Sequence, residues 1–289
     1  MYPLIPGFFD RTTAALLARG AAAVYGDHDG MAAWAGEQQW SCAAAESSRT
    51  DTFGLVALPK EQNQSRDASA TLVVFRGTRD LRNWLTDLDC AKTAYWIHGR
   101  ETRIHRGFWH AWQSVREEVA AIVQQRRVTL AGHSLGGALA MLAGIDLVQS
   151  GVEVAGVYTF GQPRVGNAAF MRQYNSALGS RSFRIVAPGD IIPCVPYLLG
   201  AYRHAGREMF IDRGLRTADC GSKGARCAEG VRLGEKLIRE TEANWHALRH
   251  HRFTPLAAHS IVNYTTLVSQ RVAHVPFNPQ SAFRNPQST

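Results

Sequence analysis

The sequence predicts an α/β fold in which helices flank a mainly parallel central sheet. Short runs rich in β-branched and aromatic residues alternate with longer stretches of helical pattern. One such run, VTLA, leads through glycine, histidine and serine into a stretch rich in alanine and leucine. The chain has 289 residues, 45% hydrophobic and 19% charged, which suffices for a sizeable core. We therefore expect one domain, residues 1–289, with insertions rather than a second core.

Hydrophobic periodicity places the individual elements in order along the chain. The expected helices are residues 8–24, 107–126, 135–149 and about 231–249. The expected strands are residues 53–58, 71–75, 128–132, 152–160 and 181–186. A polar hairpin or loop is expected at 60–69, a long loop rich in Gly, Arg and Cys at 212–230, and a frayed tail at 275–289.

The strongest chemical signal is the sequence LAGHSLGGA at residues 130–138. Gly132 and Gly136 flank Ser134 in a G-x-S-x-G pattern between a predicted strand and a predicted helix. In this context the serine occupies a strained turn and its hydroxyl projects above the sheet. The backbone N–H of Leu135 then faces a developing oxyanion at the helix N-terminus. We expect Ser134 to be a nucleophile, and His133 to pack and hydrogen-bond around the turn.

A serine nucleophile needs a base and an acid that orients the base, in the chain order Ser, Asp or Glu, His. Asp190 follows the predicted strand 181–186 through Pro-Gly and fits the acid; Asp146 and Asp212 are the alternatives weighed. His259 lies in the apolar stretch LAAHSIVNY and fits a base at the edge of a core. The other histidines considered for the base are His246, His250, His251 and His274.

Composition limits the remaining possibilities. The net charge of +8 favours anionic partners such as phospholipid headgroups, but no basic block is interleaved with aromatic residues, so no nucleic-acid partner is expected. No apolar run is long enough to span a bilayer. The first ten residues lack a signal-peptide pattern, which leaves localisation open between the cytoplasm and secretion as a trimmed mature form. The cysteine spacing predicts no metal site; Cys220 and Cys227 could close a small loop in an oxidising compartment.

Together with the serine motif, four further stretches resemble the fungal-type class 3 lipases. These are FRGT at 75–78, LRNWLTDL at 81–88, FGQPRVGN at 160–167 and DIIP at 190–193. The resemblance covers about residues 53 to 264 and implies an α/β-hydrolase fold with a short helical lid. It implies an ester hydrolase, most directly a triacylglycerol lipase, that needs no cofactor. It also implies that Thr78 and Leu135 form the oxyanion hole, and that the FGQPRVGN loop supports the active-site face.

The segment 79–90 is the candidate lid. Its apolar residues recur at three- and four-residue spacing and form one helical face: Leu81, Trp84, Leu85 and Leu88. Such a face can cover an acyl pocket in water and turn toward lipid at an oil–water interface, or it can pack permanently on the core. Trp96, Trp109 and Trp112 line a hydrophobic cleft or belong to the core.

Three functions therefore compete. The first is a lipase that acts on acylglycerols. The second is a phospholipase A1, feruloyl-type esterase or acyltransferase on the same scaffold, because fold does not fix substrate. The third is a non-catalytic binding protein, which the presence of Ser134, Asp190 and His259 disfavours. Acyl-chain preference and oligomeric state do not follow from the sequence.

Overall fold

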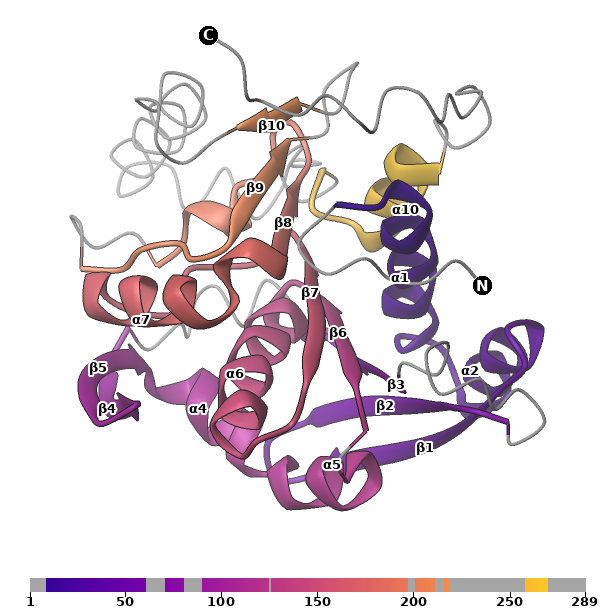
Figure 1. Ribbon diagram of the computed structural model, residues 1–289. Coiled ribbons are helices and arrows are strands. Elements are labelled where there is room, and N and C mark those ends of the chain that lie inside the picture. Colours follow the sequence, from indigo (N-terminus) through magenta and orange to yellow (C-terminus); the bar gives the residue numbers. More distant parts are fainter. Residues whose placement is uncertain are drawn as a thin grey trace, which may run out of the picture.

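The central feature of the fold is a twisted eight-stranded sheet (Figure 1). A computed structural model describes residues 9–60, 71–80, 90–124, 126–196, 201–210, 216–218 and 258–269. In spatial order the strands of the sheet are β1 (Trp40–Ser47), β2 (Thr52–Pro59), β3 (Thr71–Phe75), β6 (Val128–His133), β7 (Val154–Phe160), β8 (Ser182–Val186), β9 (Arg207–Phe210) and β10 (Arg216–Ala218). A separate antiparallel hairpin consists of β4 (Lys92–Ile97) and β5 (Arg100–His105).

The centre of the sheet is parallel, as the alternation of strands and helices predicts. Strands β3, β6, β7, β8 and β9 pair in parallel, whereas β1, β2 and β10 are antiparallel to their neighbours. The carboxyl ends of β6 and β8 therefore lie at the same edge of the sheet. The serine motif follows β6 and Asp190 follows β8, so both reach one edge.

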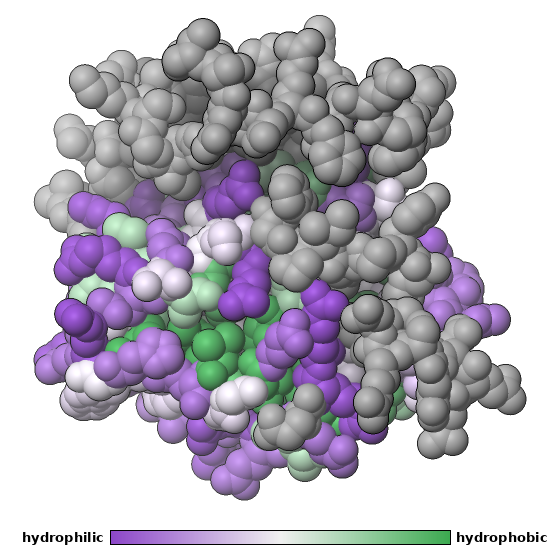
Figure 2. All heavy atoms as spheres, in the orientation of Figure 1, coloured by the Kyte–Doolittle hydropathy of each residue, from purple (hydrophilic) through white to green (hydrophobic). Residues whose placement is uncertain are grey.

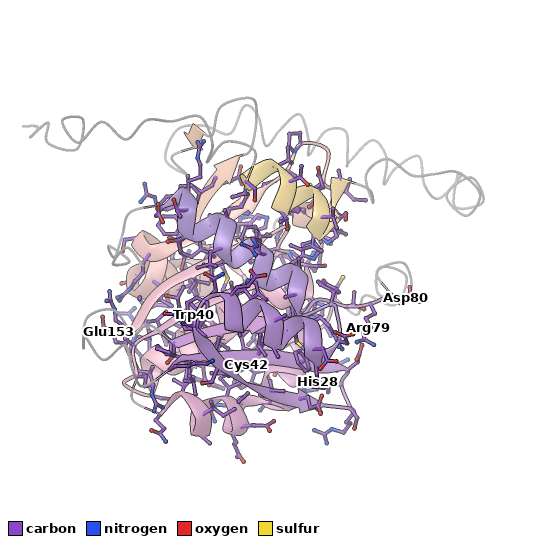
Figure 3. All side chains as sticks on the ribbon, turned by 90° about the vertical axis from the view of Figure 1, so that its right-hand side faces the viewer. His28, Trp40, Cys42, Arg79, Asp80 and Glu153 are labelled. Carbon is purple, nitrogen blue, oxygen red and sulfur yellow. The ribbon has the colours of Figure 1, made fainter. Side chains whose placement is uncertain are left out.

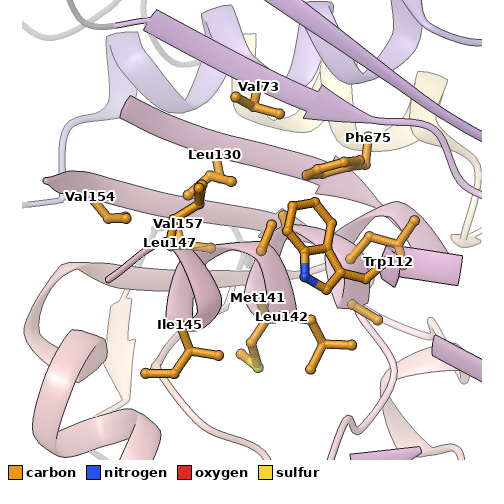
Figure 4. Packing of buried hydrophobic residues seen from close by; sticks show 14 of the residues in the cluster. Val73, Phe75, Trp112, Leu130, Met141, Leu142, Ile145, Leu147, Val154 and Val157 are labelled. Atoms are coloured by element: carbon orange, nitrogen blue, oxygen red, sulfur yellow. The ribbon is translucent and has the colours of Figure 1, made fainter. Parts of the chain in front are cut away.

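Helices cover both faces of this sheet. One face carries α1 (Arg11–Ala23), α2 (His28–Glu37) and α10 (Ile261–Ser269). The other carries α4 (Arg106–Gln113), α5 (Arg116–Val123), α6 (Leu135–Gln149) and α7 (Ala168–Leu178). Strand side chains alternate between the two cores, so that Val73 and Phe75 join one while Leu72 and Val74 join the other. Figure 4 shows α6 side chains such as Met141 and Leu142 beneath the strands, beside the ring of Trp112.

Several described elements were not expected from the sequence, among them strand β1 and helix α2. Strand β1, WSCAAAES, has no β-branched residue, and its extended form depends on continuous pairing with β2. Helix α2, HDGMAAWAGE, contains two glycines, which are poor helix formers. It is held by an N-cap, where Asp27 accepts from Gly30 N–H at 2.8 Å, and by burial of Trp34. A Cβ at Gly20 of α1 would lie 2.7 Å from the Trp34 ring, so glycine makes this packing possible.

The predicted helix 107–126 is wrong as one element, because the chain forms two helices, α4 and α5. The break falls at Ser114, whose hydroxyl donates to the Ala111 carbonyl at 2.8 Å and also bonds Thr50 at 2.6 Å. Serine side chains that bond nearby backbone compete with the helical pattern. Val115 then leaves helical geometry with φ −125° and ψ 0°.

Several expectations fall wholly or partly beyond the described residues. Within the predicted loop 212–230, Arg216–Ala218 forms β10, a short strand that exists through pairing with β9 and has no periodic signal of its own. The remainder of that loop lies outside the described residues. So do the predicted helix 231–249, the tail 275–289 and Cys220 and Cys227.

Figure 2 shows the face seen in Figure 1, where hydrophilic side chains occupy much of the visible periphery and hydrophobic ones gather near its centre. Among the described helices, none combines the length and apolar character needed to cross a bilayer. Two large hydrophobic side chains are exposed on the described part of the chain, Trp96 and Val262.

Candidate active site

The turn around Ser134 has the strained geometry that the G-x-S-x-G pattern predicts. Ser134 joins β6 to α6 with φ 57° and ψ −128°, a conformation that side-chain-bearing residues rarely adopt. A Cβ on Gly132 would lie 2.2 Å from the Gly136 carbonyl, and one on Gly136 would lie 2.2 Å from the Phe75 carbonyl oxygen. Glycine is thus the residue that fits at both positions without moving the backbone.

Ser134 is fixed through its backbone, while its hydroxyl is unpartnered among the residues that the structure describes. Its N–H donates to the Phe160 carbonyl at 2.9 Å, and its carbonyl accepts from Gly137 N–H at 3.0 Å. The side chain is buried, and among the described residues Oγ has no hydrogen-bond partner. Leu135 is the first residue of α6, so its N–H has no acceptor within the helix.

The structure brings Asp190 and His259 together from positions 69 residues apart. Asp190 follows β8 and His259 precedes α10; both are buried, and His259 Nδ1 lies 2.8 Å from Asp190 Oδ2. Donation from Nδ1 to the carboxylate leaves Nε2 with the lone pair that a general base needs. His259 Nε2 is buried and, like Ser134 Oγ, has no hydrogen-bond partner within the described part of the chain.

Asp190 is held by two further donors, one of which the sequence did not indicate. The Ile192 N–H donates to Oδ1 at 2.9 Å, and the Tyr264 hydroxyl donates to Oδ2 at 2.6 Å. That hydroxyl in turn accepts from Ala187 N–H at 3.0 Å. Burial, reinforced by the negative charge of Asp190, raises the pKa of Tyr264 well above its ordinary value, so the phenol keeps its proton. Tyr264 lies on α10, in the apolar stretch that contains His259, but nothing local marks its role.

Gly161 lies directly against the Asp190–His259 pair. It has φ +60°, and a Cβ there would lie 2.7 Å from Asp190 Oδ2 and 2.8 Å from His259 Nδ1. The hydrogen-bonded pair therefore occupies the space that a side chain would fill. Gly161 belongs to the FGQPRVGN loop, for which the sequence predicts a supporting role.

We expect Gly161→Ala to lower kcat for ester hydrolysis about 100-fold, because the added methyl displaces the Asp190–His259 pair by a fraction of an ångström or more. The matched control is Gly151→Ala. Gly151 has φ +83° but no atom near its Cβ position, so it measures backbone strain alone. The measurement is turnover of a dissolved short-chain ester by folded protein. Equal kcat for the two variants would contradict this role of Gly161.

The rest of the FGQPRVGN loop ties neighbouring segments together. The Gln162 side chain accepts from Thr159 at 2.8 Å and donates to the Pro163 carbonyl at 3.1 Å. Arg164 N–H donates to the Val195 carbonyl at 2.8 Å, just past the Asp190 loop, and the Val165 carbonyl accepts from His105 N–H at 2.9 Å. These bonds connect the Asp190 loop with the β4–β5 hairpin.

The FRGT stretch lies against the serine turn. A Cβ on Gly77 would lie 2.7 Å from the His133 carbonyl oxygen and 3.0 Å from Ser134 Cβ, which brings Thr78 to the same turn. Arg76 anchors the end of β3 by an ion pair with Asp51 at 2.6 Å. The Thr78 hydroxyl accepts from Asp80 N–H at 3.3 Å. Figure 3 shows Arg79 and Asp80 at the rim of the molecule, directly after this stretch.

The predicted lid residues Leu81, Trp84, Leu85 and Leu88 lie outside the described residues. Of the three tryptophans considered for a cleft, Trp112 is a fully buried core residue and Trp96 is 56% exposed on the hairpin. Trp109 is partly buried and its ring packs 4.9 Å from that of Tyr95.

One of the alternative acids, Asp146, links helices and has no hydrogen bond to a histidine within the described part of the chain. Asp146 of α6 accepts from Trp112 Nε1 at 3.1 Å and from Arg116 Nε at 2.5 Å, so it links α4, α5 and α6. Asp212 lies outside the described residues, as do the alternative bases His246, His250, His251 and His274.

Comparison with known proteins agrees with this geometry. Residues 72–200 match the family model described as "Lipase (class 3)". The lipase of Rhizomucor miehei is 34% identical over 180 residues, which cover 54% of this chain and 49% of that protein. Phospholipase A1-II 1 of Oryza sativa subsp. japonica is 29% identical over 206 residues, covering 61% and 52%. The chain thus spans about half the length of the curated relatives it matches.

A solved triacylglycerol lipase, whose catalytic centre is described as a serine protease triad, superposes with a TM-score of 0.62 and 26% identity. The match covers 76% of this chain and 88% of that structure. The strand order and serine turn of the present chain, together with this superposition, show that it has the α/β-hydrolase fold. The match of residues 72–200 and these relatives make the chain similar to the class 3 lipases over that part of its length.

Proposed function

We propose that the protein is a serine carboxylester hydrolase, and specifically a triacylglycerol lipase. The observation that carries the proposal is the buried hydrogen bond between His259 Nδ1 and Asp190 Oδ2, made beside a serine in a strained strand-to-helix turn. Ser134 is the nucleophile, His259 the general base and Asp190 the acid that orients the imidazole. Thr78 and Leu135 supply the backbone N–H groups of the oxyanion hole.

The mechanism runs through an acyl-enzyme. Ser134 Oγ attacks the ester carbonyl carbon while His259 Nε2 takes the hydroxyl proton, and the carbonyl oxygen becomes an oxyanion that Thr78 and Leu135 bind. Collapse expels the alcohol, which receives the proton from His259. Water then attacks the acyl-enzyme, again with His259 as base, and releases the fatty acid and free Ser134. Asp190 stabilises the imidazolium in both halves and stays ionised.

The proposed substrate is an acylglycerol at an oil–water interface. The similarity to class 3 lipases over residues 72–200 and the amphipathic pattern of segment 79–90 support a lipid ester over a soluble one. A phospholipase A1 activity is the second candidate. Its support is the net charge of +8, which favours anionic headgroups, and the similarity to a plant phospholipase A1.

The test is hydrolysis of tributyrin and triolein below and above the concentration at which an emulsion forms, with Ser134→Ala as the blank. A lipase with a working lid accelerates when the emulsion appears. Preference for dissolved tributyrin with no such increase would make the protein an esterase and segment 79–90 a packed helix. Faster hydrolysis of phosphatidylglycerol vesicles than of triolein would favour the phospholipase.

A further inference from the structure

Tyr25, which follows α1, contacts two residues that adjoin the candidate active site, His133 and Gly77. Its hydroxyl lies 2.9 Å from His133 Nδ1. The backbone of Gly77 hydrogen-bonds to the same oxygen, and a Cβ on Gly77 would lie 2.2 Å from it. Burial raises the pKa of Tyr25, and the Gly77 contact partly opposes this, as donation from an N–H does. Tyr25 therefore remains a phenol that accepts from Gly77.

His133 extends the connection to His259. Its Nε2 lies 2.6 Å from the His259 carbonyl oxygen, and the two imidazole rings contact each other with centroids 4.5 Å apart and planes tilted by 33°. Because a carbonyl only accepts, Nε2 carries the proton, and Nδ1 must accept from Tyr25. Burial, reinforced by the neighbouring His259, lowers the pKa of His133 well below its ordinary value, so the ring is neutral. Every hydrogen bond in the chain Gly77, Tyr25, His133, His259 thus has a fixed direction.

This series of hydrogen bonds joins three parts of the site that come from distant positions in the sequence. Gly77 precedes Thr78, His133 precedes Ser134, and the carbonyl at its end belongs to His259. We propose that Tyr25 and His133 are positioning residues that hold the oxyanion strand, the nucleophile turn and the base in fixed relation during acyl transfer. This inference rests on the proposed hydrolase function of the same site. In this role neither residue exchanges a proton or forms a bond with the substrate.

Tyr25→Phe tests the proposal because it removes one hydroxyl and keeps the ring. We expect kcat for a dissolved p-nitrophenyl ester to fall about tenfold, since small misplacements of reacting groups have large effects. KM should stay within about twofold, because no substrate contact is lost. Tyr174→Phe is the matched control: it removes a buried hydroxyl that bonds Ser182 at 2.8 Å, away from this chain of bonds. It should leave kcat unchanged.

A double-mutant cycle separates positioning from general loosening of the structure. His133→Gln retains an N–H for the His259 carbonyl but loses the Nδ1 acceptor, so it breaks the same link as Tyr25→Phe. The double variant should therefore be no slower than the slower single variant, whereas Tyr174→Phe should combine independently with His133→Gln. Multiplying effects of Tyr25→Phe and His133→Gln, or a Tyr25→Phe kcat equal to wild type, would overturn the positioning role and leave the hydrolase proposal intact. A wild-type protein inert to esters and to a fluorophosphonate would overturn both.

Discussion

Ser134→Ala is expected to lower kcat for ester hydrolysis about 10⁶-fold, because it removes the atom that forms the acyl-enzyme. Among the described residues Ser134 Oγ bonds to no protein group, so its loss breaks no bond that stabilises the fold. A backbone φ of 57° strains alanine and serine about equally. The free energy of unfolding should therefore change by less than about 1 kcal/mol. The measurements are turnover of a dissolved short-chain ester and thermal unfolding.

Ser182→Ala is the matched control for this prediction. Ser182 is also a buried serine, but its hydroxyl bonds Tyr174 at 2.8 Å. Its removal should lower the unfolding temperature and leave kcat of the folded protein near wild type. A Ser134→Ala protein that keeps most of the wild-type turnover would show that another residue is the nucleophile.

Asp190→Asn has the second largest expected effect, a fall in kcat of about 10⁴-fold. Oδ2 accepts from both His259 and Tyr264, and Oδ1 accepts from Ile192 N–H. In asparagine an NH₂ group replaces one of the two carboxylate oxygens. In either orientation of the amide this NH₂ group faces a group that itself donates, so at least one of these hydrogen bonds is lost. The imidazole then loses its orientation, and the imidazolium formed during the reaction loses its negative partner. The change is read from kcat in a dissolved-ester assay.

Asp146→Asn gives the comparison for that experiment. Asp146 is a similarly buried carboxylate, yet its partners are Trp112 and Arg116 rather than a histidine. We expect it to lower the free energy of unfolding and to leave kcat of the folded fraction largely intact. If Asp146→Asn reduced kcat more than Asp190→Asn, the assignment of the acid would be wrong.

The sequence predicted those features that depend on local pattern. Residues 128–133 and 135–149 carry strong strand and helix signals, and the glycines around Ser134 indicate the turn between them. The order of Asp190 and His259 in the chain and their flanking residues predict them as the acid and the base. The structure places them in hydrogen-bond contact, and their catalytic roles stay predictions.

Features that depend on tertiary contact had no local signal. Tyr264 reaches Asp190 across 74 residues, and Tyr25 reaches His133 across 108. Neither tyrosine differs in its flanking sequence from a core aromatic residue. Strand β1 has no strand signal because its alanines favour a helix, and pairing with β2 overrides that preference. Helix α2 has a weak helix signal because its two glycines disfavour a helix, and packing overrides that preference. The split of the predicted helix 107–126 follows from the Ser114 side chain, whose partner Thr50 is remote in sequence.

Ser134 is proposed as the activated nucleophile of this site. The most direct measurement is reaction of the folded protein with a fluorophosphonate, followed by mass-spectrometric mapping of the modified residue. We expect one adduct, on Ser134, that is absent from Ser134→Ala and formed far more slowly in His259→Ala and Asp190→Asn. Modification of a different serine with loss of activity, or ester hydrolysis that persists while Ser134 stays unmodified, would contradict the account.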